Sequence, residues 1–145
     1  LGLRFVDLDA EIESREGRSI PEIFAAEGEA GFRGIETTVA RDVLASKDLA
    51  VIATGGGFPI QEANRKLVRE CSQTMVVYLD VALDEATRRV AGDAHRPLAQ
   101  DKARFEALYN TRKPIYEAFA DFKITTNLKN TSTDIAKALA RLVDK

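Results

Sequence analysis

The stretch RFVDLDAEIE, residues 4–13, changes from apolar to acidic within a few positions. Phe5 and its apolar neighbours predict a short buried strand, and AEIE predicts the start of a helix. Because side chains alternate along a strand, Asp7 and Asp9 would point to the same side. Repulsion and desolvation oppose two like charges at the end of a buried strand unless a cation lies beside them. The stretch therefore predicts a cationic group near the end of this strand.

Strand-like runs alternate with helical patterns along the rest of the chain. AVIAT (50–54) and MVVYL (75–79) are apolar on both faces, as strands covered on both sides must be, and DFKITTN (121–127) is a last short strand. This alternation predicts an α/β fold with a parallel sheet. No repeat, low-complexity tract or linker interrupts the 145 residues, so a single domain is expected.

Helices are expected between these strands. Ser19 and Glu22 have the spacing of a capping box, and Pro21 falls in the first turn of the helix that they predict. Further helical patterns cover residues 10–16, 29–45, 61–71, 83–93, 104–120 and 131–142.

Polar features follow the predicted strands where each strand ends. Asp7 and Asp9 follow the first strand, a run of three glycines follows the second, and Asp80 follows the third. Ligands of parallel α/β sheets bind beyond the carboxyl ends of the strands. The pattern therefore predicts that these features lie near one another at a ligand site.

The glycine run is Gly55, Gly56 and Gly57. A tight turn between strand and helix would explain an isolated run of this kind, because glycine permits a positive φ. Three consecutive glycines exceed what a turn needs. They favour exposed backbone N–H groups that a polar ligand approaches closely.

Three arginines, Arg33, Arg96 and Arg112, could bind an anionic ligand. A surface arginine is usually solvated, so these three matter only if they lie beside the acids and the glycines. A zinc site is improbable because His95 is the only histidine and Cys71 the only cysteine.

The composition excludes several classes of partner. The net charge of −2 gives no basic surplus for nucleic acid, and no apolar run is long enough to span a bilayer. The single cysteine cannot form an internal disulfide, which fits a reducing compartment. A cytoplasmic protein without a membrane or nucleic-acid partner is expected.

The order of these motifs resembles that in the shikimate kinases. FVDLDAEIESREGRSIPEIFAAEGEAGFRGIE (5–36) resembles the stretch after the family's first helix, ATGGG (53–57) its glycine motif, HRPL (95–98) its lid motif, and TRKPIYEAFA (111–120) its substrate-arginine helix. The resemblance covers nearly the whole chain. It implies a three-layer, P-loop NTPase-like fold with a parallel sheet of order 2-3-1-4-5. It also implies phosphorylation of the 3-hydroxyl of shikimate by ATP with Mg²⁺, a step of aromatic amino acid biosynthesis.

The resemblance implies roles for the acceptor-side residues. Asp9 would contact the hydroxyls of shikimate and accept a proton from the attacking 3-hydroxyl, and Asp7 would lie near Mg²⁺. Arg33 and Arg112 would clamp the shikimate carboxylate, since the planar guanidinium binds two oxygens at once. The glycines at 55–57 would lie against the ring with their backbone N–H groups directed to a hydroxyl.

On the nucleotide side, the resemblance implies a lid loop at about residues 92–104. Arg96 on this lid would close over the ATP phosphates and act in catalysis. Arg89, in TRRVAG, would lie against adenine. A magnesium ion and the arginines would make the Asp7 and Asp9 pair tolerable.

One part of the family pattern is missing. No G-x-x-x-x-G-K-[ST] phosphate loop occurs in the chain, and the central first strand that precedes this loop is expected to be absent with it. The strands at 4–8 and 49–53 would then lose their bridge to those at 74–79 and 122–126. Little or no kinase activity is expected of these residues alone.

Three explanations of the missing loop are open. The chain can be an N-terminally incomplete piece of an ordinary shikimate kinase that is monomeric when complete, which the initial Leu1 favours. It can be a non-catalytic binding or regulatory module, or a second chain can supply the loop. A gluconate kinase-like enzyme is a weaker alternative, because it lacks the FRGIE and R-x-P-x-Y helices.

Overall fold

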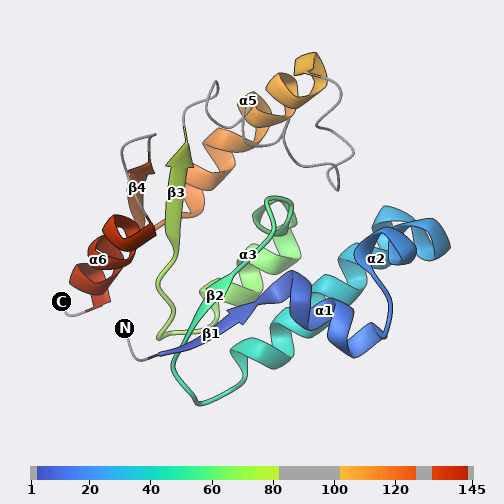
Figure 1. The fold of residues 1–145 in the computed structure, drawn as a ribbon, viewed down its shortest axis with the longest axis horizontal. Coiled ribbons are helices and arrows are strands. Elements are labelled where there is room, and N and C mark those ends of the chain that lie inside the picture. Colours follow the sequence, from blue (N-terminus) through green and yellow to red (C-terminus); the bar gives the residue numbers. More distant parts are fainter. Residues whose placement is uncertain (1–2, 82–101, 127–131, 144–145) are drawn as a thin grey trace. The chain divides into compact units, whose positions relative to one another are not determined.

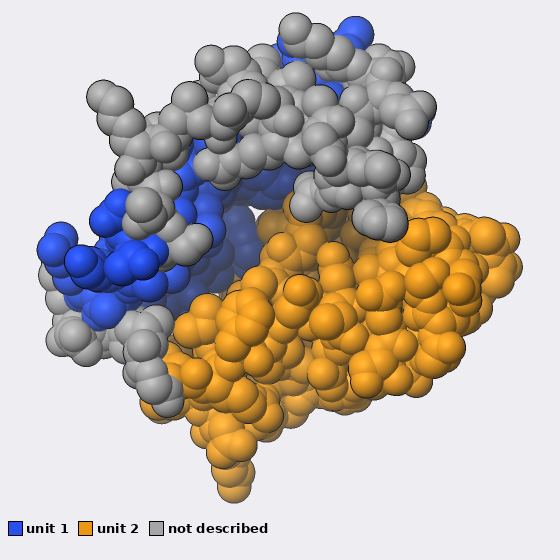
Figure 2. All heavy atoms as spheres, viewed as in Figure 1, with its two compact units in different colours: residues 1, 75–145 blue, residues 2–74 orange. Residues whose placement is uncertain are grey.

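The computed structural model describes residues 3–81, 102–126 and 132–143 (Figure 1). The chain forms two compact units, one of residues 2–74 and one of residues 75–145 together with residue 1 (Figure 2). Each unit contains a pair of parallel strands and its own helices. The prediction of a single domain stays a prediction.

The first unit, residues 2–74, is built on strands β1 (Arg4–Asp7) and β2 (Ala50–Ala53), which pair in parallel with Arg4 opposite Ala50. Helices α1 (Leu8–Glu16) and α2 (Ile20–Leu44) connect the two strands. A short 3₁₀ helix, η1 (Phe58–Ile60), and helix α3 (Glu62–Arg69) follow β2. The core consists of Leu8, Ile12, Ile23, Phe32, Val39, Ala40, Val43, Phe58 and Val68.

The boundaries of α1 and α2 follow from local backbone chemistry. Gly17, with φ 67°, ends α1 in a left-handed conformation. The Ser19 side chain accepts the Glu22 N–H at 3.3 Å and Pro21 lies in the first turn, so the predicted start of α2 is confirmed. Gly28 interrupts α2 with φ 72° and ψ −178°, which kinks the helix where the sequence predicted two successive helical stretches.

The second unit pairs strands β3 (Val77–Val81) and β4 (Phe122–Thr126) in parallel, with Val77 opposite Phe122. Helix α5 (Lys102–Phe119) precedes β4, and helix α6 (Ser132–Val143) follows it. The helix predicted over residues 104–120 is confirmed, and it continues through Pro114. Among the described helices, none is long and apolar enough to cross a membrane.

The predicted α/β fold with parallel strands is confirmed. In the described residues no strand joins the β1–β2 pair to the β3–β4 pair. Without its central strand 1, the order 2-3-1-4-5 leaves the pairs 2-3 and 4-5. These correspond to β1–β2 and β3–β4. The central strand itself stays a prediction.

Three predictions of burial are wrong, and one of them is Leu79 in β3, which is 44% exposed although both faces of this strand were expected to be covered. Phe5 was expected in a buried strand, but 65% of it is exposed, because β1 is four residues long and no described element covers that face. Met75 was expected in the core of a strand, but β3 begins only at Val77 and Met75 is 36% exposed. Tyr78 does lie in β3 and is half-buried.

Candidate active site

Asp7 and Asp9 do not lie on one strand, so the predicted alignment of their carboxylates by strand alternation is wrong. Strand β1 ends at Asp7, and Asp9 lies in the first turn of α1. Asp7 Oδ1 accepts the backbone N–H of Asp9 at 3.0 Å and that of Ala10 at 3.4 Å. The carboxylate is therefore the N-cap of α1, stabilised by two backbone donors and by the positive end of the helix dipole.

The glycine turn at 55–57 brings backbone close to charged side chains, at Gly55 and Gly57, without needing a left-handed conformation. Gly17 and Gly28 are the described residues with positive φ, so the turn at 55–57 does not depend on a left-handed conformation. A Cβ on Gly55 would lie 3.4 Å from Asp9 Oδ2, and a Cβ on Gly57 would lie 2.7 Å from Cζ of Arg33. The Asp9 carboxylate and the Arg33 guanidinium therefore lie directly against this glycine turn.

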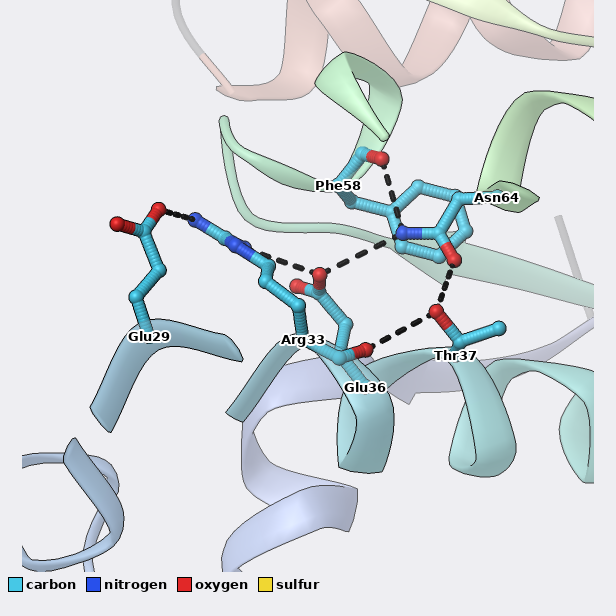
Figure 3. A network of polar contacts seen from close by, with 6 residues as sticks. All are labelled: Glu29, Arg33, Glu36, Thr37, Phe58 and Asn64. Atoms are coloured by element: carbon cyan, nitrogen blue, oxygen red, sulfur yellow. Dashed lines mark hydrogen bonds and ion pairs between the residues drawn. The ribbon is translucent and has the colours of Figure 1, made fainter. Parts of the chain in front are cut away.

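Arg33 is held inside the first unit by carboxylates of its own helix (Figure 3). Its side chain is 17% exposed, with Nη1 donating to Glu36 Oε1 at 3.0 Å and Nη2 3.7 Å from Glu29 Oε1. The guanidinium carbon lies 5.2 Å from the centre of the Phe32 ring. The buried Nε has no hydrogen-bond partner in the described part of the chain, so one donor of the guanidinium is left unsatisfied.

A buried polar network supports Arg33, and sequence reasoning missed it. Glu36 is 1% exposed and Asn64 is 0% exposed. Asn64 Nδ2 donates to Phe58 O at 3.0 Å and lies 3.5 Å from Glu36 Oε1, while Asn64 Oδ1 accepts from Thr37 Oγ1 at 2.6 Å. The one sequence signal was the spacing of Arg33 and Glu36, which places them on the same helix face.

Burial raises the pKa of Glu36, and the nearby Asp9 carboxylate acts in the same direction. The hydrogen bond and the charge of Arg33, and the hydrogen bond from Asn64, oppose this rise. The charged form of Glu36 therefore depends on the two groups that hold it. Asp9, Arg33 and Glu36 form one electrostatic group beside the glycine turn.

This arrangement offers two complementary contacts to a small ligand. The guanidinium of Arg33 lies against Gly57 and can bind an anionic group. The carboxylate of Asp9 lies against Gly55 and can accept a hydrogen bond from a hydroxyl. Both groups and the glycine turn belong to the same unit, so the structure brings these sequence-predicted residues together.

Other predicted site residues are not brought into this group. Arg112 lies half-buried on α5 in the second unit, and its predicted partnership with Arg33 stays a prediction. Arg89, His95 and Arg96 lie outside the described residues. Of the lid predicted at about 92–104, residues 92–101 also lie outside them.

Asp80 has partners within the second unit. Its carboxylate accepts the Tyr78 hydroxyl at 3.1 Å and lies 3.7 Å from Lys113 Nζ and 4.0 Å from Lys123 Nζ. Burial and the hydrogen bond to Asp80 raise the pKa of Tyr78. These contacts tie β3 to α5 and β4, which gives Asp80 a structural role. Its predicted position beside Asp9 stays untested.

Comparison with known proteins decides the family. The family model described as shikimate kinase matches residues 1–143. This chain belongs to the shikimate kinase family. The resemblance read from the four sequence motifs is thereby confirmed, and with it the assignment to kinases that use ATP as co-substrate.

Individual shikimate kinases agree with this assignment. The chain is 36% identical to that of Rhodococcus erythropolis, over 100% of this chain and 85% of the relative, and 38% identical to that of Chromobacterium violaceum, over 99% and 78%. The structure of shikimate kinase from Acinetobacter baumannii in complex with shikimate superposes with a TM-score of 0.88 at 35% identity, over 98% of this chain and 79% of that one. The Aquifex aeolicus shikimate kinase gives a TM-score of 0.83 at 29% identity, over 98% and 82%.

Proposed function

We propose that this protein transfers the γ-phosphoryl group of ATP to the 3-hydroxyl of shikimate, with Mg²⁺. The observation that carries the proposal is the pair of contacts at the glycine turn, Asp9 against Gly55 and Arg33 against Gly57. A cation and a carboxylate that lie against one short glycine turn suit a small cyclic acid that carries hydroxyls. The Acinetobacter baumannii relative, solved with shikimate, supports this choice of acceptor.

The acceptor would be held at both ends. Arg33 and Arg112 would clamp its carboxylate, because the guanidinium fork matches two carboxylate oxygens. Asp9 would address the hydroxyls, and the backbone N–H groups of Gly55, Gly56 and Gly57 would complete the contact with the ring. Cytoplasmic location, a monomeric state and the absence of nucleic-acid partners are proposed with this function.

The reaction itself would need little covalent chemistry from the protein. Phosphoryl transfer passes through a loose transition state, so positioning and charge neutralisation supply most of the acceleration. Asp9 as general base would add about 10²–10⁴-fold. Arg96 would stabilise charge on the transferring group from the lid, and Arg89 would lie against adenine.

Asp7 is the residue of this chain proposed to lie near Mg²⁺. No cluster of three or more histidine, cysteine or acidic side chains that could hold a metal occurs in the described residues. This fits Mg²⁺, which is usually held by one or two carboxylates, by waters and by the substrate phosphates. Because Oδ1 of Asp7 accepts two backbone N–H groups, Oδ2 is the oxygen that could meet a magnesium-bound water.

The lack of a phosphate loop in this sequence limits the chemistry that these residues can perform alone. The sequence holds no G-x-x-x-x-G-K-[ST] segment, so the backbone cradle and the lysine for the phosphates are not among its 145 residues. We therefore propose that the isolated chain binds acceptor but has little or no kinase activity. The alternative, a binding or regulatory module without catalysis, rests on the same absence.

The test uses the product of the full reading frame from which this sequence comes. ADP release should depend on shikimate, ATP and Mg²⁺ together, and phosphorus NMR should identify the 3-phosphate. Arg33→Lys keeps the charge but loses the fork, so it should raise the KM for shikimate about tenfold or more. Arg41→Lys, at an exposed position of the same helix, is the matched control.

Two results would decide against the proposal. Shikimate binding without any phosphorylation would favour the binding module. An unchanged KM in the Arg33→Lys variant would show that Arg33 does not hold the acceptor.

A further inference from the structure

Asn64 connects three separate segments of the first unit through one buried amide (Figure 3). It lies on α3, donates from Nδ2 to Phe58 O after the glycine turn, and contacts Glu36 Oε1 on α2 with the same nitrogen. Its Oδ1 accepts from the Thr37 hydroxyl, also on α2. The amide is fully buried and both of its ends have partners.

The chemistry of these partners fixes the orientation of the amide. A backbone carbonyl and a carboxylate can only accept, so the NH₂ group must face Phe58 O and Glu36. With the NH₂ group fixed in this way, Oδ1 faces the Thr37 hydroxyl at 2.6 Å, whose single proton is shared between Oδ1 and the Arg33 carbonyl oxygen of its own helix at 3.0 Å. The reverse orientation would place an oxygen against two acceptors. Neither an aspartate nor an apolar residue of the same shape could make this set of contacts.

The Asn64 amide holds groups on both sides of the contact between the glycine turn and the Arg33 guanidinium. Phe58 belongs to the turn side, and Glu36 to the side of Arg33. Phe58 directly follows Gly57, where an added Cβ would clash with the Arg33 guanidinium. Glu36 accepts from Arg33 Nη1 at 3.0 Å. Asn64 is therefore tied both to the turn and, through Glu36, to the guanidinium that rests on it.

We propose that Asn64 is a positioning residue for acceptor binding. Asn64 fixes the position of the Arg33 guanidinium through Glu36, and the position of the glycine turn through the Phe58 carbonyl. It acts through these groups and touches no substrate itself. This inference rests on the proposed function, since Arg33 is taken to bind the acceptor carboxylate.

The electrostatics of Glu36 support this role. The hydrogen bond from Asn64 lowers the pKa of Glu36 against the rise that burial causes. Asn64 thus favours the charged carboxylate, which is the form that binds Arg33 most strongly.

The first test is Asn64→Asp in the full reading-frame product. The substitution keeps the shape but turns an oxygen toward Phe58 O and Glu36, which displaces both. The KM for shikimate should rise about tenfold or more. The kcat at saturating shikimate and the KM for ATP should stay within about twofold, because losing a contact made equally in the ground state and the transition state raises the acceptor KM alone.

The second test is a matched pair of neighbouring threonines. Thr37→Val removes the donor to Asn64 Oδ1, and the KM for shikimate should rise about threefold or more. Thr38→Val is the control, since the exposed Thr38 hydroxyl donates to Gly34 O of its own helix, as Thr37 does to Arg33 O, and among the described residues no contact with Asn64 is recorded for it. Thermal unfolding of all variants separates a loss of stability from a loss of positioning.

A lower melting temperature with an unchanged KM for shikimate in Asn64→Asp and Thr37→Val would overturn the inference, because Asn64 would then be only structural. If Asn64→Asp does not fold, the comparison of Thr37→Val with Thr38→Val decides. Failure of the proposed function is distinguishable, because the wild-type protein would then not phosphorylate shikimate, whether or not it binds it.

Discussion

The backbone at Gly57 has φ −82° and ψ −14°, a conformation open to any residue, yet an added Cβ would lie 2.7 Å from Cζ of Arg33. Because the guanidinium ends a flexible side chain, Gly57→Ala should displace the guanidinium rather than the backbone of the turn. The displaced guanidinium should weaken shikimate binding about tenfold or more, measured by calorimetry.

Gly34→Ala is the control for Gly57→Ala. Gly34 is exposed on α2 and nothing lies within 4 Å of an added Cβ, so affinity should not change. Undiminished affinity in Gly57→Ala would contradict the assignment of this turn to the acceptor site.

The raised pKa of Glu36 predicts that the free energy of unfolding depends on pH. Its folded-state pKa is raised above the usual 4.5 by burial, in an environment formed by Arg33, Asp9 and Asn64. The folded state therefore keeps a proton that the unfolded state has lost, and this contribution to the free energy of unfolding falls as pH rises through the raised pKa. Urea unfolding of wild type and Glu36→Gln over a pH series should show the wild type losing stability relative to the variant as pH rises. A relative gain with rising pH would mean that Arg33 outweighs burial.

At the scale of residues, the sequence pattern indicated some of the side chains that lie near one another, while their roles stay predictions. The glycine run, Asp9 and Arg33 were singled out by their positions, and the structure brings them together. Glu36 and Asn64 were missed, because a charged or amide residue on a helix gives no sign that it is buried.

At the scale of elements, substitutions at Asp7 can distinguish its role as the N-cap of α1 from its proposed role near Mg²⁺. Asparagine caps a helix about as well as aspartate, so Asp7→Asn should change the free energy of unfolding by less than about 0.5 kcal/mol. Asp7→Ala removes the cap as well and should cost about 1 kcal/mol. If Asp7 also faces a magnesium-bound water, Asp7→Asn should need more Mg²⁺ for half-maximal activity of the full product. An unchanged Mg²⁺ requirement would leave Asp7 as a helix cap only.

Helices were predicted better than strand ends. The Ser19 cap and the helix through Pro114 followed from local signals and are confirmed. The strand at Asp7 was extended too far, because an aspartate that ends a strand and one that caps a helix look alike in the sequence. Phe5 was expected to be buried because an apolar residue in a short strand does not reveal which face is covered.

At the scale of the whole molecule, the alternation of strands and helices was sufficient to predict parallel α/β structure. The pairing of β1 with β2 and of β3 with β4 followed only from the family's strand order, since pattern alone does not specify strand neighbours. The proposed acceptor residues are divided between the units, with Asp9 and Arg33 in one and Arg112 in the other. The proposed function requires these residues to act on one ligand.

A double-mutant cycle on Arg33 and Arg112 tests that requirement most directly. Calorimetry would give the dissociation constant of shikimate for the full reading-frame product and for Arg33→Ala, Arg112→Ala and the double variant. If both guanidinium groups hold one carboxylate, each single change should weaken binding at least about tenfold, and the two effects should deviate from additivity by more than about 0.5 kcal/mol. Wild-type affinity in Arg112→Ala, or strict additivity of the two changes, would contradict the account.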